Sequence, residues 1–168
     1  MKQFGGGVTD CLIRIARMNP NRSDGSRPSV PPVIVEKELS RVIVGCFFDV
    51  YNELGYGYVE SLYKRALEMT LRANGLRVDR EYPMVVTFRG QQIGFHRLDM
   101  LVEERIVLEV KSTERLAESA KRQLRSYVTG LGIDLGILLH FGPLPRYHRV
   151  LAGRRMNLNY PIQRKSAD

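Results

Sequence analysis

The sequence lacks the features that mark membrane, disulfide-rich and zinc-binding proteins. Its two cysteines, Cys11 and Cys46, are too few for a disulfide framework and form no C-x-x-C pair of the kind that binds zinc. No apolar run approaches the roughly 20 residues of a membrane-spanning helix. The short apolar segment at 11–16 is interrupted by Arg14, so it does not resemble a signal peptide. These absences favour a cytoplasmic protein that does not contact a membrane.

Acidic residues are also in short supply. The chain has 18 Asp and Glu residues against 26 Lys and Arg residues, which gives a formal net charge of +8. This excess favours a polyanionic partner, and the guanidinium of Arg, which outnumbers Lys, is well suited to bind phosphate. The alternative is a surplus that serves only solubility. We therefore expect a nucleic-acid partner, DNA before RNA, and leave open whether the chain forms a homodimer.

Apolar residues are sparse near both ends of the chain. Residues 1–32 are rich in turn-forming residues such as Gly5–Gly7, and we expect them to form a flexible tail. Met18 offers an alternative start of the chain. Residues 154–168 are expected to form a basic tail. The remaining segment, 33–153, has a length typical of one domain with its own core.

Hydrophobic periodicity predicts three helices. From Glu36 to Leu54, apolar residues recur at steps of three and four, and the glycines at 55 and 57 end the pattern. A second helix is predicted up to Asn74, and a third from a cap at Ser112–Glu114 to Gly130. The inner faces of these two helices are expected to carry Leu62, Tyr63, Ala66, Leu67 and Leu71, and Leu116, Ala120, Gln123, Leu124, Tyr127 and Val128, respectively.

Between and after these helices, the sequence predicts strands. A strand at 80–88 is expected to offer Val85, Val86 and Phe88 to the core, and a second begins at 91–95. This second strand either breaks near His96 or continues into the next segment. Further strands are predicted in a hairpin at 98–111 that turns near 103–105, in a buried run at 135–140, and at an edge at 147–151.

The order of these elements indicates the fold class. The predicted strand that ends at Lys111, the third helix and the strand at 135–140 form a β-α-β crossover, which favours parallel pairing of the two strands. The hairpin strands pair in the antiparallel sense. We therefore predict an α/β fold with a mixed central sheet flanked by helices.

Three charged residues interrupt the apolar strands of the predicted hairpin. Glu109 and Lys111 are two residues apart and so share a face, and Asp99 lies on the partner strand. Because burying an unpaired charge is costly, the three need one another, a metal ion or solvent. Two carboxylates on neighbouring strands suit Mg²⁺ (or Mn²⁺), which activates water and polarises a phosphoryl oxygen, and Lys111 could orient or deprotonate that water. The alternative is an exposed, salt-bridged face.

Two further polar residues have two interpretations each. Glu60 falls in the first turn of the second predicted helix, where an acidic side chain stabilises the helix dipole or adds a carboxylate to the metal site. Gln123 on the third helix is either a satisfied polar group in the core or a group that reaches the site. His96, His140 and His148 show no metal-ligand spacing, so we expect them to be structural or at the surface.

Three segments resemble a known family. Gly57-x-x-Glu60-x-x-Tyr63, then RLDMLVEERIVLEVKS, then QLRSYV, are similar in order to the GxxExxY family of the PD-(D/E)XK nuclease superfamily, which has the restriction-endonuclease-like fold. The similarity covers roughly residues 36–151. It implies an α-β-β-β-α-β core. The sequence departs from the superfamily at Leu98, which replaces the proline of the motif, and at Tyr51, where similar sequences often carry histidine.

The resemblance also implies roles for individual residues. Asp99 and Glu109 would be the two metal-binding acidic residues, Lys111 the catalytic lysine, Glu60 a group that binds or orients the metal site, and Gln123 the glutamine found in a related exonuclease branch. We thus expect a Mg²⁺-dependent nuclease.

Basic residues outside this set are expected to contact phosphates: Arg72, Arg77, Arg80, Arg115, Lys121, Arg122 and Arg125. Two alternatives to the nuclease stay open. One is a non-catalytic nucleic-acid-binding or adaptor module that retains the fold, and the other is an interaction protein that binds an acidic protein partner.

Overall fold

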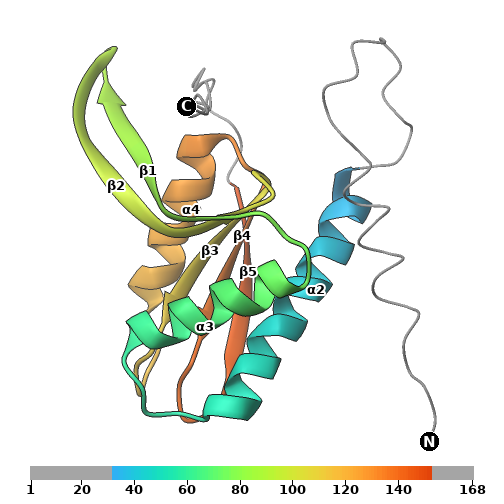
Figure 1. Ribbon diagram of the computed structural model, residues 1–168. Helices are drawn as coiled ribbons and strands as arrows, with labels where there is room; N and C mark the ends of the chain where they lie inside the picture. Colours follow the sequence, from blue (N-terminus) through green and yellow to red (C-terminus); the bar gives the residue numbers. More distant parts are fainter. Residues whose placement is uncertain (1–31, 153–168) are drawn as a thin grey trace, which may run out of the picture.

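The computed structural model describes residues 32–152, which form three helices and five strands (Figure 1). The elements are α2 (Pro32–Leu54), α3 (Glu60–Ala73), β1 (Val78–Phe88), β2 (Gln91–Val102), β3 (Ile106–Lys111), α4 (Glu118–Leu131), β4 (Leu135–His140) and β5 (Arg146–Leu151). The predicted tails at 1–32 and 154–168 lie outside the described residues, apart from Pro32, which begins α2. None of the helices in the described part is both long enough and apolar enough to cross a membrane.

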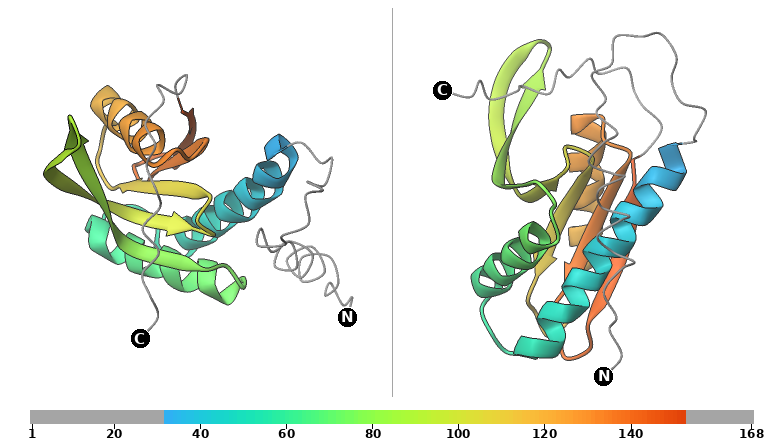
Figure 2. Two further views of the ribbon diagram at one scale, coloured as in Figure 1. Left: turned by 90° about the horizontal axis from the view of Figure 1, so that it is seen from above. Right: turned by 45° about the vertical axis from the view of Figure 1, so that its right-hand side comes forward.

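The five strands form one mixed sheet in the order β1-β2-β3-β4-β5. β3 pairs in parallel with β4, and all other neighbours are antiparallel. Helices α2 and α3 cover one face of the sheet and α4 covers the other (Figures 1 and 2). The run from α3 to β4 is the predicted α-β-β-β-α-β core, so the predicted fold class is confirmed.

Helices α2 and α3 form the larger of the two cores. Leu39, Ile43 and Phe47 recur at steps of four on α2 and are fully buried against the sheet. On α3 the buried side chains are Tyr63, Leu67 and Leu71. Leu62, predicted to lie on the inner face of α3, is 48% exposed, because that face is narrower than the apolar pattern suggested.

Helix α4 begins later than the sequence predicts. The expected cap at Ser112–Glu114 is wrong, because the Ser112 hydroxyl donates to the carbonyl of Tyr58, and the Thr113 hydroxyl donates to the carbonyl of Arg115. The backbone therefore stays irregular up to the true N-cap, Ala117, which supplies no side-chain hydrogen bond. The helix also continues through Gly130, the predicted end, and stops at Gly132, whose φ of 67° suits glycine.

The hairpin of β1 and β2 extends well beyond the rest of the sheet (Figures 1 and 2). β2 is continuous from Gln91 to Val102, so the second of the two alternatives at His96, one uninterrupted strand, is present. Met84 on this hairpin is buried against α4. Phe88, predicted to enter the core, is 59% exposed, because it lies near the tip of the hairpin. The apolar pattern of β1 does not show how far along the hairpin the support of α4 extends.

The thiol of Cys46 provides a test of the core formed by α2 and α3. Burial, with a smaller contribution from Asp49, raises the pKa of Cys46 to about 11. At pH 8 only about one-thousandth of the thiol is therefore in the reactive thiolate form. We expect iodoacetamide to leave Cys46 unlabelled in the folded protein and to label it in urea, as measured by mass spectrometry of its peptide. Equal labelling rates in both conditions would contradict the burial.

Candidate metal-binding active site

The site lies where β2 separates from β3. The two strands pair only from Met100 opposite Leu108 to Val102 opposite Ile106. Beyond Met100, β2 diverges, and the Oδ2 atom of Asp99 accepts a hydrogen bond of 2.7 Å from the backbone N–H of Val110. A side-chain carboxylate thus takes the place of a strand partner and is held at the fork in the sheet.

Glu109 and Lys111 lie at the end of β3, beside this fork. They alternate with Leu108 and Val110, which face the core under α2 and α3, so both point to the α4 side of the sheet. Glu109 is only 4% exposed. Its Oε1 atom accepts a hydrogen bond of 2.6 Å from Nζ of Lys111. The predicted placement of these two residues on one face is therefore confirmed, and the structure pairs them.

Lys64, which the sequence analysis did not select, joins the remaining carboxylates. Its Nζ atom lies 2.6 Å from Oε1 of Glu60 and 2.6 Å from Oδ1 of Asp99. Glu60 begins α3, and Lys64 follows one helical turn later. The signal for this pair was available as an acidic residue four positions before a lysine on a helix. The contact with Asp99 was not, because it joins a helix to a distant strand.

Tyr63 fixes the position at which α3 begins. Its hydroxyl donates to the carbonyl of Gly55 at 2.6 Å and accepts from the N–H of Tyr58 at 3.3 Å. Its ring stacks on Phe141 with centroids 4.3 Å apart. Gly57 allows the intervening loop to turn, with a φ of 122°. The Gly57-x-x-Glu60-x-x-Tyr63 motif is therefore a local unit that positions Glu60.

The electrostatics of the cluster centre on Glu109. Burial raises the pKa of Glu109, and the nearby charge of Asp99 raises it further, while Lys111 and Lys64 oppose the shift. The contribution of Asp99 indicates that its carboxylate lies close enough to repel that of Glu109. A cation placed between them would relieve that repulsion.

Both lysines are held in the charged form. Burial lowers the pKa of Lys64, but hydrogen bonds to Asp99 and Glu60 outweigh it and raise the pKa overall. Burial also lowers the pKa of Lys111, and its hydrogen bond to Glu109 again outweighs the effect. A protonated Lys111 can donate hydrogen bonds and stabilise negative charge, whereas it cannot accept a proton in this state.

The side chain of Gln123 bonds to Tyr127. It is exposed on α4, contrary to the predicted apolar face, and its Nε2 atom donates to the Tyr127 hydroxyl at 2.6 Å. Burial raises the pKa of Tyr127, and the charge of Glu109 raises it further. The Tyr127 hydroxyl therefore interacts electrostatically with the site. Tyr127, expected on the inner face of its helix, is buried in the core under α4.

The predicted phosphate contacts are scattered over the surface. Arg77 pairs with Glu104 near the turn that precedes β3, and a strand of six residues, roughly 20 Å, separates that turn from Lys111. Arg80 pairs with Glu68 on α3. Arg115, Arg122 and Arg125 are exposed on or before α4. Their role as phosphate contacts remains a prediction.

A pocket of about 370 Å³ opens at the start of α4, beside the end of β4. It combines Arg115, Lys121 and Arg146 with Glu114 and Glu118. Because β3 and β4 pair in parallel up to their last residues, this pocket lies next to the end of β3 that carries Lys111. It therefore adds cationic groups to the same end of the sheet.

The donor set fits a magnesium site of limited size. Within residues 32–152, no group of three or more His, Cys, Asp or Glu side chains is arranged to hold a metal ion. Mg²⁺ needs only one or two carboxylates when water and phosphate oxygens complete its shell. The two mutually repelling carboxylates, Asp99 and Glu109, meet that requirement. The predicted role of Glu60 as a further ligand remains a prediction.

The mixed sheet and the helices on its two faces form a restriction-endonuclease-like α/β fold. The chain belongs to the PD-(D/E)XK nuclease superfamily, which it matches over residues 37–150. Among solved structures, the crystal structure of SSO0001 is similar at 19% identity and a TM-score of 0.46, with 71% of this chain and 61% of that chain covered. The chain thus spans less than two thirds of that protein's length. No curated protein matches the chain.

Replacing Lys64 tests its role between two carboxylates. We expect Lys64→Met to lower the free energy of unfolding by about 1–3 kcal/mol, because Glu60 and Asp99 would lose their shared cation while partly buried. Thermal denaturation at neutral pH and low salt measures the effect. The control is Lys121→Met, which in the described part of the chain removes a pair with the exposed Glu118. Equal melting temperatures for Lys64→Met and wild type would contradict the role.

Replacing Tyr63 tests the loop anchor. Tyr63→Phe retains the ring stack but removes the hydrogen bonds to the loop before α3, so we expect a loss of about 1 kcal/mol in the free energy of unfolding and faster amide exchange across 55–59. Hydrogen-exchange mass spectrometry measures the second effect. In the control, Tyr51→Phe, exchange should rise instead near Gly142, whose carbonyl Tyr51 binds. Unchanged exchange at 55–59 in Tyr63→Phe would refute the anchor.

Proposed function

We propose that the chain is a metal-dependent nuclease of the GxxExxY type that hydrolyses phosphodiester bonds in DNA or RNA. The observation that carries the proposal is the buried Glu109, which is repelled by Asp99 at a fork in the sheet and bonded to Lys111. A buried carboxylate beside a second, partly buried one is costly to maintain. The arrangement is typical of a site that binds a cation.

In this proposal each residue has a defined role. Asp99 and Glu109 would hold Mg²⁺ or Mn²⁺, which supplies a polarised phosphoryl oxygen and a more acidic water when bound. Lys111, held in the charged form, donates hydrogen bonds to the attacking water or to a phosphate oxygen rather than removing a proton. Glu60 assists by holding Lys64 against Asp99. Gln123 supports the site by orienting the Tyr127 hydroxyl.

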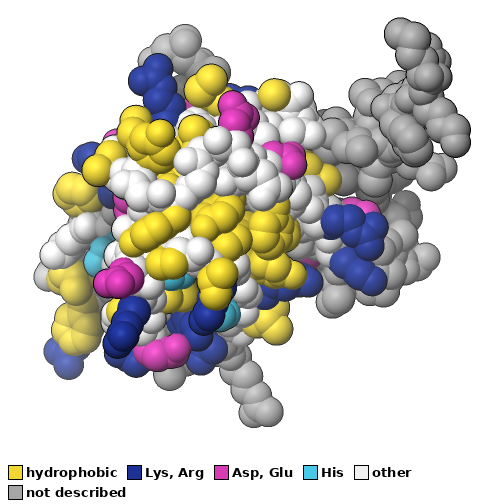
Figure 3. All heavy atoms as spheres, turned by 90° about the horizontal axis from the view of Figure 1, so that it is seen from below, with side chains coloured by type: hydrophobic (Ala, Val, Ile, Leu, Met, Phe, Trp, Pro, Cys, Tyr) yellow, Lys and Arg dark blue, Asp and Glu magenta, His cyan; other side chains and the backbone are white. Residues whose placement is uncertain are grey.

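The surface around the site supports a nucleic-acid substrate. The loops at 55–59 and 141–145 form the lower end of the molecule in Figure 1, and Figure 3 shows hydrophobic side chains gathered at this end among charged ones. Tyr56 and Tyr58 are 45% and 50% exposed here, close in sequence to Glu60. Aromatic side chains of this kind stack on bases, and the neighbouring pocket supplies Arg115, Lys121 and Arg146 for phosphates.

One observation favours a second candidate, a non-catalytic nucleic-acid-binding module. Lys64 and Lys111 pair with all three carboxylates of the cluster, so the charges are largely balanced without a metal ion. Such a cluster would stabilise the fold while the basic surface binds nucleic acid. This candidate predicts salt-sensitive binding without turnover in the presence of any divalent metal.

Removal of each proposed group should abolish cleavage. We expect Glu109→Gln, Asp99→Asn and Lys111→Ala each to reduce Mg²⁺-dependent cleavage by at least about 100-fold, because each removes a charge at the reacting phosphate. Cleavage of single- and double-stranded DNA and RNA, measured with Mg²⁺ and with Mn²⁺, provides the readout. The matched control is Glu118→Gln, an exposed carboxylate whose ion-pair partner within residues 32–152 is Lys121.

Two results would overturn the assignment. If cleavage is equal in wild type and in the three variants, the activity arises elsewhere. If no substrate is cleaved but nucleic acid binds with a steep salt dependence, the non-catalytic module is correct.

A further inference from the structure

A row of basic side chains crosses the ends of β3, β4 and β5. Lys111 lies opposite His140 in the pairing of β3 with β4, and His140 lies opposite Arg146 in the pairing of β4 with β5. Leu138 and Val150, on the same strands, pack under α4. His140 and Arg146 lie an even number of residues away from them, so they face α4 as Lys111 does. The row therefore leads from the candidate active site to the pocket at the start of α4.

His140 lies on the floor of this pocket with one nitrogen unpaired. Its side chain lines the pocket although it is only 4% exposed. Its Nε2 atom lies 2.7 Å from the carbonyl oxygen of Thr113, and because a carbonyl can only accept, Nε2 carries a proton. The other nitrogen, Nδ1, is buried and has no hydrogen-bond partner among the described residues. Buried polar atoms nearly always have a partner, so this nitrogen is available to a group that enters the pocket.

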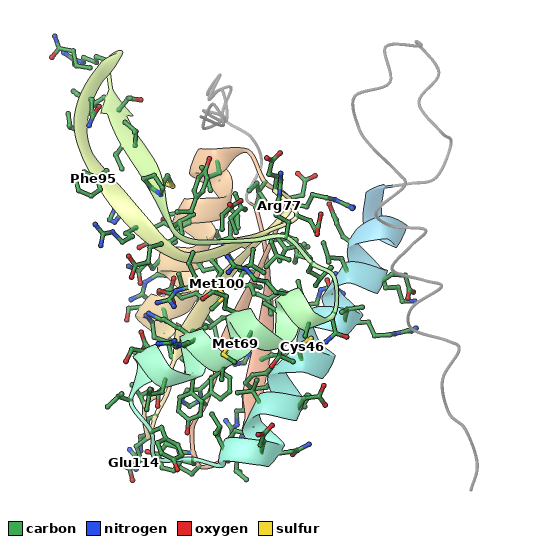
Figure 4. All side chains as sticks on the ribbon, viewed as in Figure 1. Cys46, Met69, Arg77, Phe95, Met100 and Glu114 are labelled. Atoms are coloured by element: carbon green, nitrogen blue, oxygen red, sulfur yellow. The ribbon has the colours of Figure 1, made fainter. Side chains whose placement is uncertain are left out.

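Two arginines at the pocket are available to bind an anion. Arg115 and Arg146 are exposed, and neither forms an ion pair within residues 32–152. Lys121 also lines the pocket, but its Nζ atom bonds to Glu118 at 2.9 Å, so these two charges balance. Glu114 adds an exposed carboxylate at the rim, at the lower end of the molecule in Figure 4. The pocket thus attracts an anion, while Glu114 would repel a chain of phosphates that runs across it.

The electrostatics of His148 indicate that these groups act on one place. Burial lowers the pKa of His148, and the charge of Lys121 lowers it further. Arg146 and His140 have the same effect, whereas Glu118 opposes it. Positive charge is therefore in excess around this ring, which lines the same pocket.

We propose that the pocket binds a terminal phosphate of the nucleic acid, so that the protein prefers strands with a phosphorylated end. A terminal phosphate carries a charge of about −1.5 to −2 at neutral pH and has three oxygens that accept hydrogen bonds. Arg115, Arg146 and the protonated ring of His140 supply donors for these oxygens. An internal phosphate has one charge fewer, and its chain would have to leave the pocket on both sides.

The pocket is close enough to Lys111 for one strand to reach both. Neighbouring strands of a sheet lie about 5 Å apart, so the backbones of Arg146 and Lys111 are about 10 Å apart. This distance corresponds to about three nucleotides of a DNA strand. The inference rests on the proposed function only because that function brings a nucleic acid to this end of the sheet.

Binding of single strands by the full chain in EDTA tests the proposal without cleavage. Three strands of one sequence carry a 5′-phosphate, a 3′-phosphate or hydroxyl groups at both ends, and fluorescence anisotropy gives their dissociation constants. We expect at least one phosphorylated strand to bind about tenfold more tightly than the hydroxyl strand, because it adds charge-assisted hydrogen bonds. Equal dissociation constants for the three strands, or no binding of any strand, would overturn the proposal.

Arginine variants on the two faces of β5 locate the preference. Arg146→Gln should remove most of the difference between phosphorylated and hydroxyl strands. Arg149→Gln should keep it, because Arg149 is on the same strand but lines a separate cavity beside α2. If Arg146→Gln weakens the binding of all three strands equally and keeps the preference, Arg146 contacts internal phosphates and the proposal is wrong.

The pKa of His148, followed by proton NMR, tests whether the phosphate enters this pocket. The preferred phosphorylated strand should raise this pKa above its value with the hydroxyl strand, because a nearby dianion favours the charged ring. The same pKa with both strands would refute the pocket as the binding site. Mg²⁺-dependent cleavage without a preference for phosphorylated ends would refute this inference alone. The preference without any cleavage would refute the proposed nuclease activity alone.

Discussion

The hydrogen bond between the Val110 N–H and the Asp99 carboxylate is the contact on which the site depends. It forms because β2 leaves β3 after Met100, so a buried backbone donor on β3 would otherwise be unsatisfied. A side chain thereby completes the ladder, and its second oxygen stays free to meet Lys64. In a fully paired sheet, the Val110 N–H would bond to a backbone carbonyl of β2 and leave no donor for this carboxylate. The fork is therefore both a structural and a chemical feature.

The cluster at the fork balances burial against charge. Glu109 is deeply buried, and the ammonium groups of Lys64 and Lys111 offset the cost of three carboxylates in a small volume. Three negative charges and two positive ones leave a local surplus of negative charge in a chain whose net charge is +8. A basic surface draws a polyanion to the molecule, and the acidic centre attracts a divalent cation. The positive surface and the negative cluster thus attract different partners.

Most of the fold could be predicted from the sequence, because its elements are marked by strong local patterns. The four-residue steps predicted α2, and the continuous apolar run predicted β4. The crossover rule predicted that β4 pairs in parallel with β3. The errors arose where tertiary contacts decide. Ser112 bonds to a loop rather than capping α4, and Phe88 lies beyond its supporting helix. Lys64 was missed because its second partner, Asp99, is 35 positions away in the sequence, whereas the pairing of Glu109 with Lys111 is local.

The continuity of β2 has a structural consequence. The strand runs from Gln91, at the tip of the β1–β2 hairpin, to Val102 in the core, and the hairpin packs on α4 through Met84. Asp99 lies on this strand, which pairs with β1 on both sides of it and with β3 only from Met100 onward. The position of its carboxylate therefore depends on the packing of the hairpin on α4 as well as on the core of the sheet.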